Sequence, residues 1–139
     1  MIITDQKILR QVSKPFKGSK EDLYKLIAKL DKELKTSAIP GVGLSAIQIG
    51  IPLQVAIIRT NDLDIDLYNA KIIDCSCLFR FQNEGCLSIP NTFKDTWRFK
   101  FITIENGNGD IIKLQEYASI VVQHELDHAV GVLFIDRLA

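Results

Sequence analysis

Two histidines and a glutamate near the carboxyl end of the chain have the residue types and spacing of a metal site. His124, Glu125 and His128 form the pattern H-E-x-x-H, and the chain has no other histidine. At about 3.6 residues per turn, residues four apart share one helix face, so both imidazoles can bind one ion. Glu125 lies alongside, where it can take a proton from metal-bound water and pass it to a leaving group. The flanking residues are apolar, which argues against a solvated surface. The pattern therefore predicts a catalytic metal centre.

A catalytic metal needs a third protein ligand, and the sequence places it upstream. Only eight residues follow Gly131, and they contain no histidine. Cys86 is the best candidate, because Gly85 relaxes the backbone beside the thiol and a thiolate binds borderline metals well. The alternative for Cys86 is a buried core thiol, which is how we interpret Cys75 and Cys77.

The glycine-containing segment GVGLSAIQIG, residues 41–50, is the third feature. It lacks the Gly-Lys-Ser/Thr of a phosphate loop, and alone it is equally typical of a turn before a strand. Beside a metal centre, its small residues suit a wall for a substrate backbone. Gln48 could then donate an amide N–H to a developing oxyanion.

Two helices should position these residues. The first follows Ser19, an N-cap with Asp22 three residues on, and should end before Pro40. Its apolar residues form one stripe that faces the core. The second helix, Glu116 to Val130, carries the two histidines and should stop at Gly131.

Strands account for much of the remaining chain. We expect a buried strand at Leu53–Arg59 and a half-buried antiparallel strand at Ile72–Phe81, with Cys75 and Cys77 on its inward face. Residues 99–105 and 111–114 flank Asn106–Asp110, which is a strong hairpin signal. Strands followed by a long helix predict an α+β fold of antiparallel strands packed around a central helix that carries the H-E-x-x-H motif.

Composition limits the class of protein. The 139 residues fit a single domain, 1–139, and Lys plus Arg equals Asp plus Glu at 17 each. Without a basic excess, nucleic acid is disfavoured as a partner, and no apolar stretch is long enough to predict membrane insertion. Three cysteines and no leader-like segment indicate the cytoplasm.

Taken in order, GVGLSAIQIG, EGCLS and QHELDH resemble the three signature motifs of the peptide deformylases. The resemblance runs from about Gly41 to Leu138. It implies a hydrolase that removes the N-formyl group from N-formylmethionyl nascent peptides and releases formate. It also implies a central helix, carrying the two histidines, among antiparallel strands.

Carried over residue by residue, the resemblance makes Cys86, His124 and His128 the ligands of one divalent metal, natively Fe²⁺. By ligand type alone, Zn²⁺, Ni²⁺ and Co²⁺ suit the same donors. Glu125 would be the general acid/base. The oxyanion would be stabilised by the Gln48 amide and the backbone N–H of Leu87.

The resemblance also implies how the substrate is bound, through backbone pairing and through a pocket for its methionine side chain. The main chain at Gly43 and Gly85 would pair with the peptide in strand fashion. The methionine side chain needs an apolar pocket, which four residues could line: Val42, Tyr117, Ile120 and Val121. Filling the core is an equally good interpretation of these side chains.

The chain departs from the family pattern in places. Ser45 stands where alanine is usual and is small enough to fit, and Ala70 follows Asn69 where proline is frequent. Arg98 either pairs with Glu84 or is a solvated charge. Many bacterial members continue into a C-terminal helix, so ribosome contact through that helix is left open. A shortened form occurs among phage-encoded and some organellar members, which leaves a viral origin, and location in a host cytoplasm, as alternatives.

Two other functions share parts of this pattern. A small zinc endopeptidase would take its third ligand downstream of the helix motif. A structural zinc domain would have a closed site of four ligands, with Cys75 or Cys77 joining Cys86 and both histidines.

Overall fold

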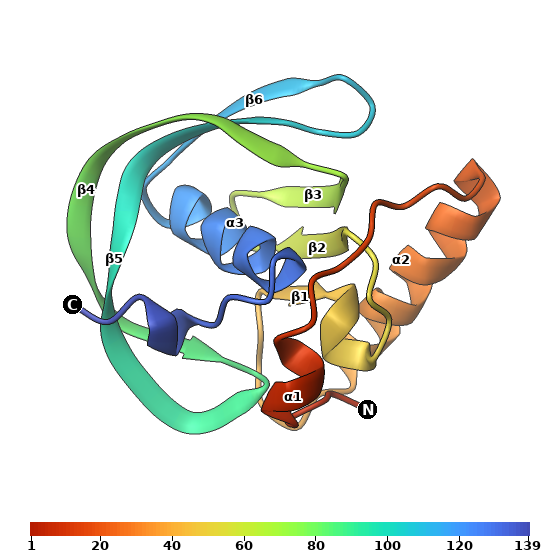
Figure 1. The fold of residues 1–139 in the computed structure, drawn as a ribbon, viewed down its shortest axis with the longest axis horizontal. Coiled ribbons are helices and arrows are strands. Elements are labelled where there is room, and N and C mark those ends of the chain that lie inside the picture. The colour runs from red at the N-terminus through yellow and green to blue at the C-terminus, as the bar shows by residue number, and fades with distance from the viewer.

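The computed structural model describes residues 1–139 as an α+β fold, as the sequence predicts, with two antiparallel three-stranded sheets. Figure 1 shows helix α3 running through the middle of the molecule, inside the curve of the long strands β4 and β5. The elements in chain order are α1 (Gln6–Leu9), α2 (Lys20–Lys35), β1 (Gly43–Ser45), η1 (Ala46–Ile49), β2 (Val55–Arg59), β3 (Asp64–Tyr68), β4 (Lys71–Cys86), β5 (Ile89–Glu105), β6 (Ile111–Gln115), α3 (Glu116–Ala129) and η2 (Phe134–Asp136).

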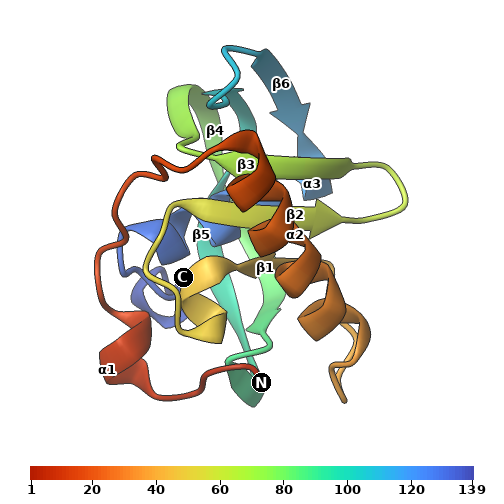
Figure 2. The ribbon, with the colours of Figure 1, turned by 90° about the vertical axis from the view of Figure 1, so that its right-hand side faces the viewer.

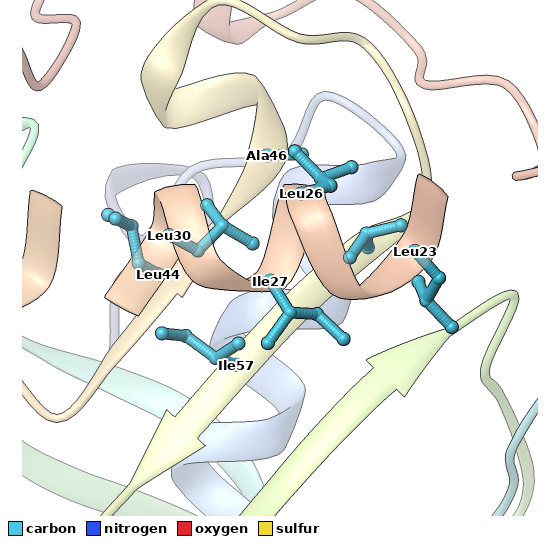
Figure 3. Packing of buried hydrophobic residues seen from close by; sticks show 8 residues of the cluster. Leu23, Leu26, Ile27, Leu30, Leu44, Ala46 and Ile57 are labelled. Atoms are coloured by element: carbon cyan, nitrogen blue, oxygen red, sulfur yellow. The ribbon is translucent and has the colours of Figure 1, made fainter. Parts of the chain in front are cut away.

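Helix α2 begins at the predicted N-cap. The Ser19 side chain accepts from the Asp22 N–H, and the Asp22 carboxylate accepts from the Ser19 N–H, so the pair forms a capping box. The apolar stripe of the helix packs on the sheet β1–β2–β3 (Figure 3), through Leu23, Leu26, Ile27 and Leu30 against Leu44, Ala46 and Ile57. Figure 2 shows α2 lying in front of this sheet, on the side opposite α3. The sheet is thereby fixed between two helices.

The second core cluster joins α3 to both sheets. Val121 and Val122 of the helix pack with Ile58 of β2 and with Ile102 and Ile104 of β5. The hairpin between β5 and β6 turns at the predicted Asn106–Asp110 segment, where Asn106 N–H donates to the Asp110 carbonyl. At the other end of α3, Gly131 has φ +76°, as a C′ residue should. These contacts hold α3 in place along its length.

Strand β4 corrects one sequence prediction. Cys75 and Cys77 are exposed rather than inward-facing, and Ile73 is about half exposed. The strand is at the edge of its sheet, with β5 as its only neighbour, and from Lys71 to Leu78 neither face is covered. A register shift after Ile72 and a positive φ at Cys77 also break the regular alternation on which the prediction depended.

The strands are longer than the sequence indicated, since β4 reaches Cys86 and β5 begins at Ile89. The chain end runs back along β5, where Trp97 N–H donates to the Arg137 carbonyl and Ala139 N–H donates to the Asp95 carbonyl. No helix is both long and apolar enough to cross a membrane.

Candidate active site

Helix α3 presents His124 and His128 one turn apart, as their spacing predicts. Their ring centroids are 5.0 Å apart and the rings meet edge to face. Cys86 approaches them from the end of β4, immediately before the tight turn into β5. The ligand atoms of these three residues all lie within 4.8 Å of one another, so segments about 40 residues apart in the chain converge on one point.

The donor set fits a divalent metal ion. Cys86 Sγ lies 3.5 Å from His128 Nε2. Tetrahedral bonds of about 2.3 Å to sulfur and 2.0–2.1 Å to nitrogen would place these two atoms roughly 3.5 Å apart. One thiolate and two imidazoles would supply three ligands, the number typical of a catalytic rather than a structural metal site.

Electrostatics at the cluster also favour a cation. Burial alone would lower the pKa of His124, but hydrogen bonds to Cys86 and Glu84 raise its pKa well above the usual value. Burial, together with the nearby charge of His124, lowers the pKa of His128 well below its usual value. The acidic neighbours that raise the pKa of His124 would also attract a bound cation, and the lowered pKa of His128 favours its neutral imidazole, the form that binds metals.

A buried network orients His124. Its Nδ1 donates to Glu84 Oε2 at 2.7 Å, so Nε2 is left to face the cluster. Burial would raise the pKa of Glu84, but the bonds from His124 and Arg98 lower it to about 2. Thr96 Oγ1 donates to Glu84 Oε1 at 2.7 Å, and Arg98 Nε donates to the same oxygen at 2.8 Å. Of the two interpretations of Arg98, a pair with Glu84 or a solvated charge, the pair is therefore confirmed.

The network extends to the end of the chain. Arg98 Nη1 donates to Asp127 at 2.7 Å, and Arg137 holds the same carboxylate at 2.9 Å. Asp127 lies within the H-E-x-x-H motif, yet the sequence analysis gave it no role. Its position three residues after His124, on the same helix face, was the available signal. By contrast, the buried Nδ1 of His128 has no hydrogen-bond partner.

Glu125 lies beside the cluster and is almost fully buried. Burial raises the pKa of its carboxyl group above the usual value, although His124 and Ser45 oppose the rise. Ser45 Oγ lies 3.1 Å from Glu125 Oε1. A Cβ added at Gly43 would stand 2.6 Å from Glu125 Oε2, so the carboxylate rests directly on the backbone of β1.

Gln48 contacts the cluster from the short helix η1. Its Oε1 accepts from the Ser45 N–H at 2.9 Å, which turns Nε2 toward Cys86. Nε2 donates to Ser88 Oγ at 3.0 Å, and its contact with Cys86 Sγ is longer, at 3.6 Å. The Gln48 amide therefore donates both to Ser88 and to Cys86, a member of the cluster.

A cavity of about 300 Å³ opens beside His124 and Glu125. The residues predicted to bind substrate all line it, namely Val42, Gly43, Gly85, Tyr117, Ile120 and Val121, and so does Leu87, one of the two predicted oxyanion donors. Phe93, which the sequence analysis missed, covers one side, and its ring would lie 2.7 Å from a Cβ at Gly85. Next to Cys86 and His124, the cavity is therefore lined both by apolar side chains and by the backbone of glycine residues.

The geometry disfavours both alternatives raised by the sequence. The cluster takes its third member, Cys86, from upstream, whereas an endopeptidase of the predicted kind would use a downstream residue. Cys75 and Cys77 are exposed on the outer part of β4 and do not belong to the cluster, so no four-ligand structural site forms.

Fold and site together define a class of α+β protein in which one cysteine and two histidines that could hold a metal ion lie beside a cavity of about 300 Å³. The model of the polypeptide deformylase family matches residues 1–139. A peptide deformylase from Pelagibacter ubique is 36% identical, with 99% of this chain and 85% of that protein aligned. One from Helicobacter pylori is 32% identical over 96% of this chain and 81% of its own length.

A solved structure leads to the same family. The crystal structure of peptide deformylase from Thermotoga maritima has a TM-score of 0.88 at 32% identity, covering 100% of this chain and 97% of that one. The chain belongs to the polypeptide deformylase family. It is an enzyme of that family, whose members remove formyl groups from N-formylmethionine peptides.

Proposed function

We propose that this chain hydrolyses the formamide bond of N-formylmethionyl peptides with one divalent metal ion held by Cys86, His124 and His128. The observation that carries the proposal is the convergence of these three ligand atoms, within 4.8 Å, beside the buried carboxyl group of Glu125. When bound, such an ion supplies Lewis-acid polarisation of the formyl oxygen and lowers the pKa of water. Fe²⁺ is the ion expected from the family resemblance, and Zn²⁺, Ni²⁺ and Co²⁺ suit the same donors.

Glu125 moves the protons in this proposal. It takes one from the water that adds to the formyl carbon and delivers one to the amine nitrogen as the C–N bond breaks. The products are formate and a peptide with a free amino group. Its raised pKa suits this work, because a general acid/base is most effective when its pKa is near the working pH.

Two donors stabilise the negative charge that develops on the formyl oxygen. Gln48 offers the N–H of Nε2 that faces Cys86, and Leu87 offers its backbone N–H from the turn after Cys86. Removing one such donor typically costs ~10²–10³ in rate. The Gln48 side chain is held on its other side by the Ser45 N–H, so little reorganisation is needed.

The peptide is held by backbone and by apolar contact. Strand β1 is at the free edge of its sheet, so Gly43 can pair with an extended substrate by strand addition. Gly85 lies across the cavity at the end of β4. Ile120 and Val121 of α3, with Val42, provide the apolar wall for the methionine side chain.

Formate release from formyl-Met-Ala-Ser tests the proposal. The protein is purified without oxygen, reloaded with Fe²⁺, and compared with Glu125→Ala and with the acetylated peptide as substrate. We expect release by the parent, a loss of ~10²–10⁴ or more in the variant, and no cleavage of the acetyl group. Background formate in every metal form would reject the proposal.

A further inference from the structure

Ser45 contacts both residues that we place at the reacting bond. It is the last residue of β1, is almost fully buried, and lies between Glu125 and Gln48. Its backbone N–H donates to Gln48 Oε1 at 2.9 Å. Its hydroxyl lies 3.0 Å from the backbone carbonyl of Glu125 and 3.1 Å from Oε1 of the same residue. From the sequence, Ser45 was expected only to be small enough to fit, and these contacts were not predicted.

The carboxyl group of Glu125 is held at two points along β1. One oxygen, Oε1, meets the Ser45 hydroxyl, and the other, Oε2, rests against Gly43. A serine hydroxyl has one donor and two acceptor lone pairs. Its one proton can go to the ionised carboxylate or to the Glu125 backbone carbonyl, and when it goes to the carbonyl the hydroxyl can accept from the protonated carboxyl group. The same contact can therefore hold Glu125 before and after it gains a proton.

A small void lies next to this contact. It measures about 10 Å³, space for about one water, and is lined by Ser45 and Glu125 together with Leu67 and Ala70. Replacing the Ser45 hydroxyl with hydrogen would enlarge the void beside the carboxyl group. Glu125 would then lose a hydrogen bond and gain room to rotate away from the cavity that the substrate enters.

We propose that the Ser45 hydroxyl is a positioning residue that orients Glu125 for delivery of a proton to the departing amine. The inference rests on the proposed function, because it assumes that Glu125 carries that proton. The backbone bond from Ser45 to Gln48 does not depend on the side chain. Removal of the hydroxyl therefore affects the Glu125 side of the site alone.

The test compares Ser45→Ala with the parent on two matched substrates. One is formyl-Met-Ala-Ser, and the other is its formate ester, in which oxygen replaces the methionine nitrogen. An amine leaves only with a proton, whereas an ester oxygen depends far less on one. We expect kcat on the amide to fall about tenfold in Ser45→Ala, with KM nearly unchanged, as the loss of a hydrogen bond to a charged group predicts. The fall on the ester should be about threefold or less.

Two further variants separate positioning from a general effect on folding. Ser119→Ala removes another buried serine hydroxyl, which lies on α3 and donates to the Phe99 carbonyl of β5. This variant should behave as the parent on both substrates. Ser45→Thr keeps the hydroxyl and should recover most of the amide activity. The bound metal per chain should be the same in all variants, because the Ser45 hydroxyl contacts no metal ligand.

Each outcome decides one of the two proposals. Unchanged amide turnover in Ser45→Ala, an equal loss on both substrates, or a loss of metal would overturn the positioning role. If the parent itself releases no formate from either substrate, the proposed function fails, and the inference fails with it.

Discussion

Arg98→Met should show how strongly the buried ion network supports the site. Arg98 is 2% exposed and donates to two carboxylates, those of Glu84 and Asp127. Methionine keeps the length and the apolar stem of the side chain but removes the charge. Both carboxylates then stay buried without their shared guanidinium.

The expected loss of stability follows from the partners that remain. Removing one member of a buried ion pair costs roughly 3–5 kcal/mol. Glu84 keeps Thr96 and His124, and Asp127 keeps Arg137. We therefore expect the lower end, about 3 kcal/mol. For a urea slope of roughly 1.5–2 kcal/mol per molar, the unfolding midpoint should fall by about 1.5–2 M.

The assay is urea unfolding of the metal-free protein, followed by far-UV circular dichroism. Arg80→Met is the matched control, because Arg80 pairs with Asp95 on the surface of the same hairpin and its side chain is mostly exposed. An exposed pair contributes little, so this variant should unfold close to the parent. Equal midpoints for the two variants would refute the role we assign to the buried network.

Metal affinity provides a second readout of Arg98→Met. Arg98 holds Glu84, and Glu84 holds His124 Nδ1, so the histidine should lose part of its orientation. Loss of such support typically weakens metal binding about 10–100-fold. Competition with a chromophoric chelator measures the change. Unchanged affinity would mean that Glu84 orients His124 without help from Arg98.

Two further predictions concern acid stability and the exposed thiols. Because the pKa of Glu84 falls from an ordinary 4.5 to about 2 on folding, its ionised form stabilises the fold at higher pH, by on the order of 3 kcal/mol. That contribution should be lost as pH falls from about 4.5 through 2, and Glu84→Gln should abolish this part of the pH dependence of the melting temperature. The double variant Cys75→Ala, Cys77→Ala should bind as much metal per chain as the parent, since both thiols are exposed and outside the cluster. A fall in bound metal would restore the four-ligand interpretation.

Local patterns predicted the helices and the residues that they carry. The H-E-x-x-H spacing requires only the period of a helix, and the α2 cap requires only residues three apart. The turn at Asn106–Asp110 is also local, since its residue types determine its conformation. Cys86 could be chosen because the chain after Gly131 offers no histidine or cysteine.

The faces of β4 could not be predicted in the same way. Alternation assigns residues to two faces but does not say which face meets the core, and one extra residue reverses the assignment. The register shifts in β4 depend on pairing with β5, and Asn83 takes a positive φ at one of them, just before Glu84 turns inward. Cys75 and Cys77 were misplaced because β4 is the edge strand: α3 packs on Ile102 of β5, whereas Cys75, which pairs with Ile102, is exposed.

The sequence by itself determined the proposed metal ligands, the proposed acid/base, the helix that carries three of these residues and the family to which the chain belongs. The tertiary structure decided how those groups are supported. The contacts of Glu84 with Arg98 and of Ser45 with Glu125 join residues 14 and 80 positions apart. Such pairs depend on strand register and on the approach of β1 to α3, which no local periodicity encodes.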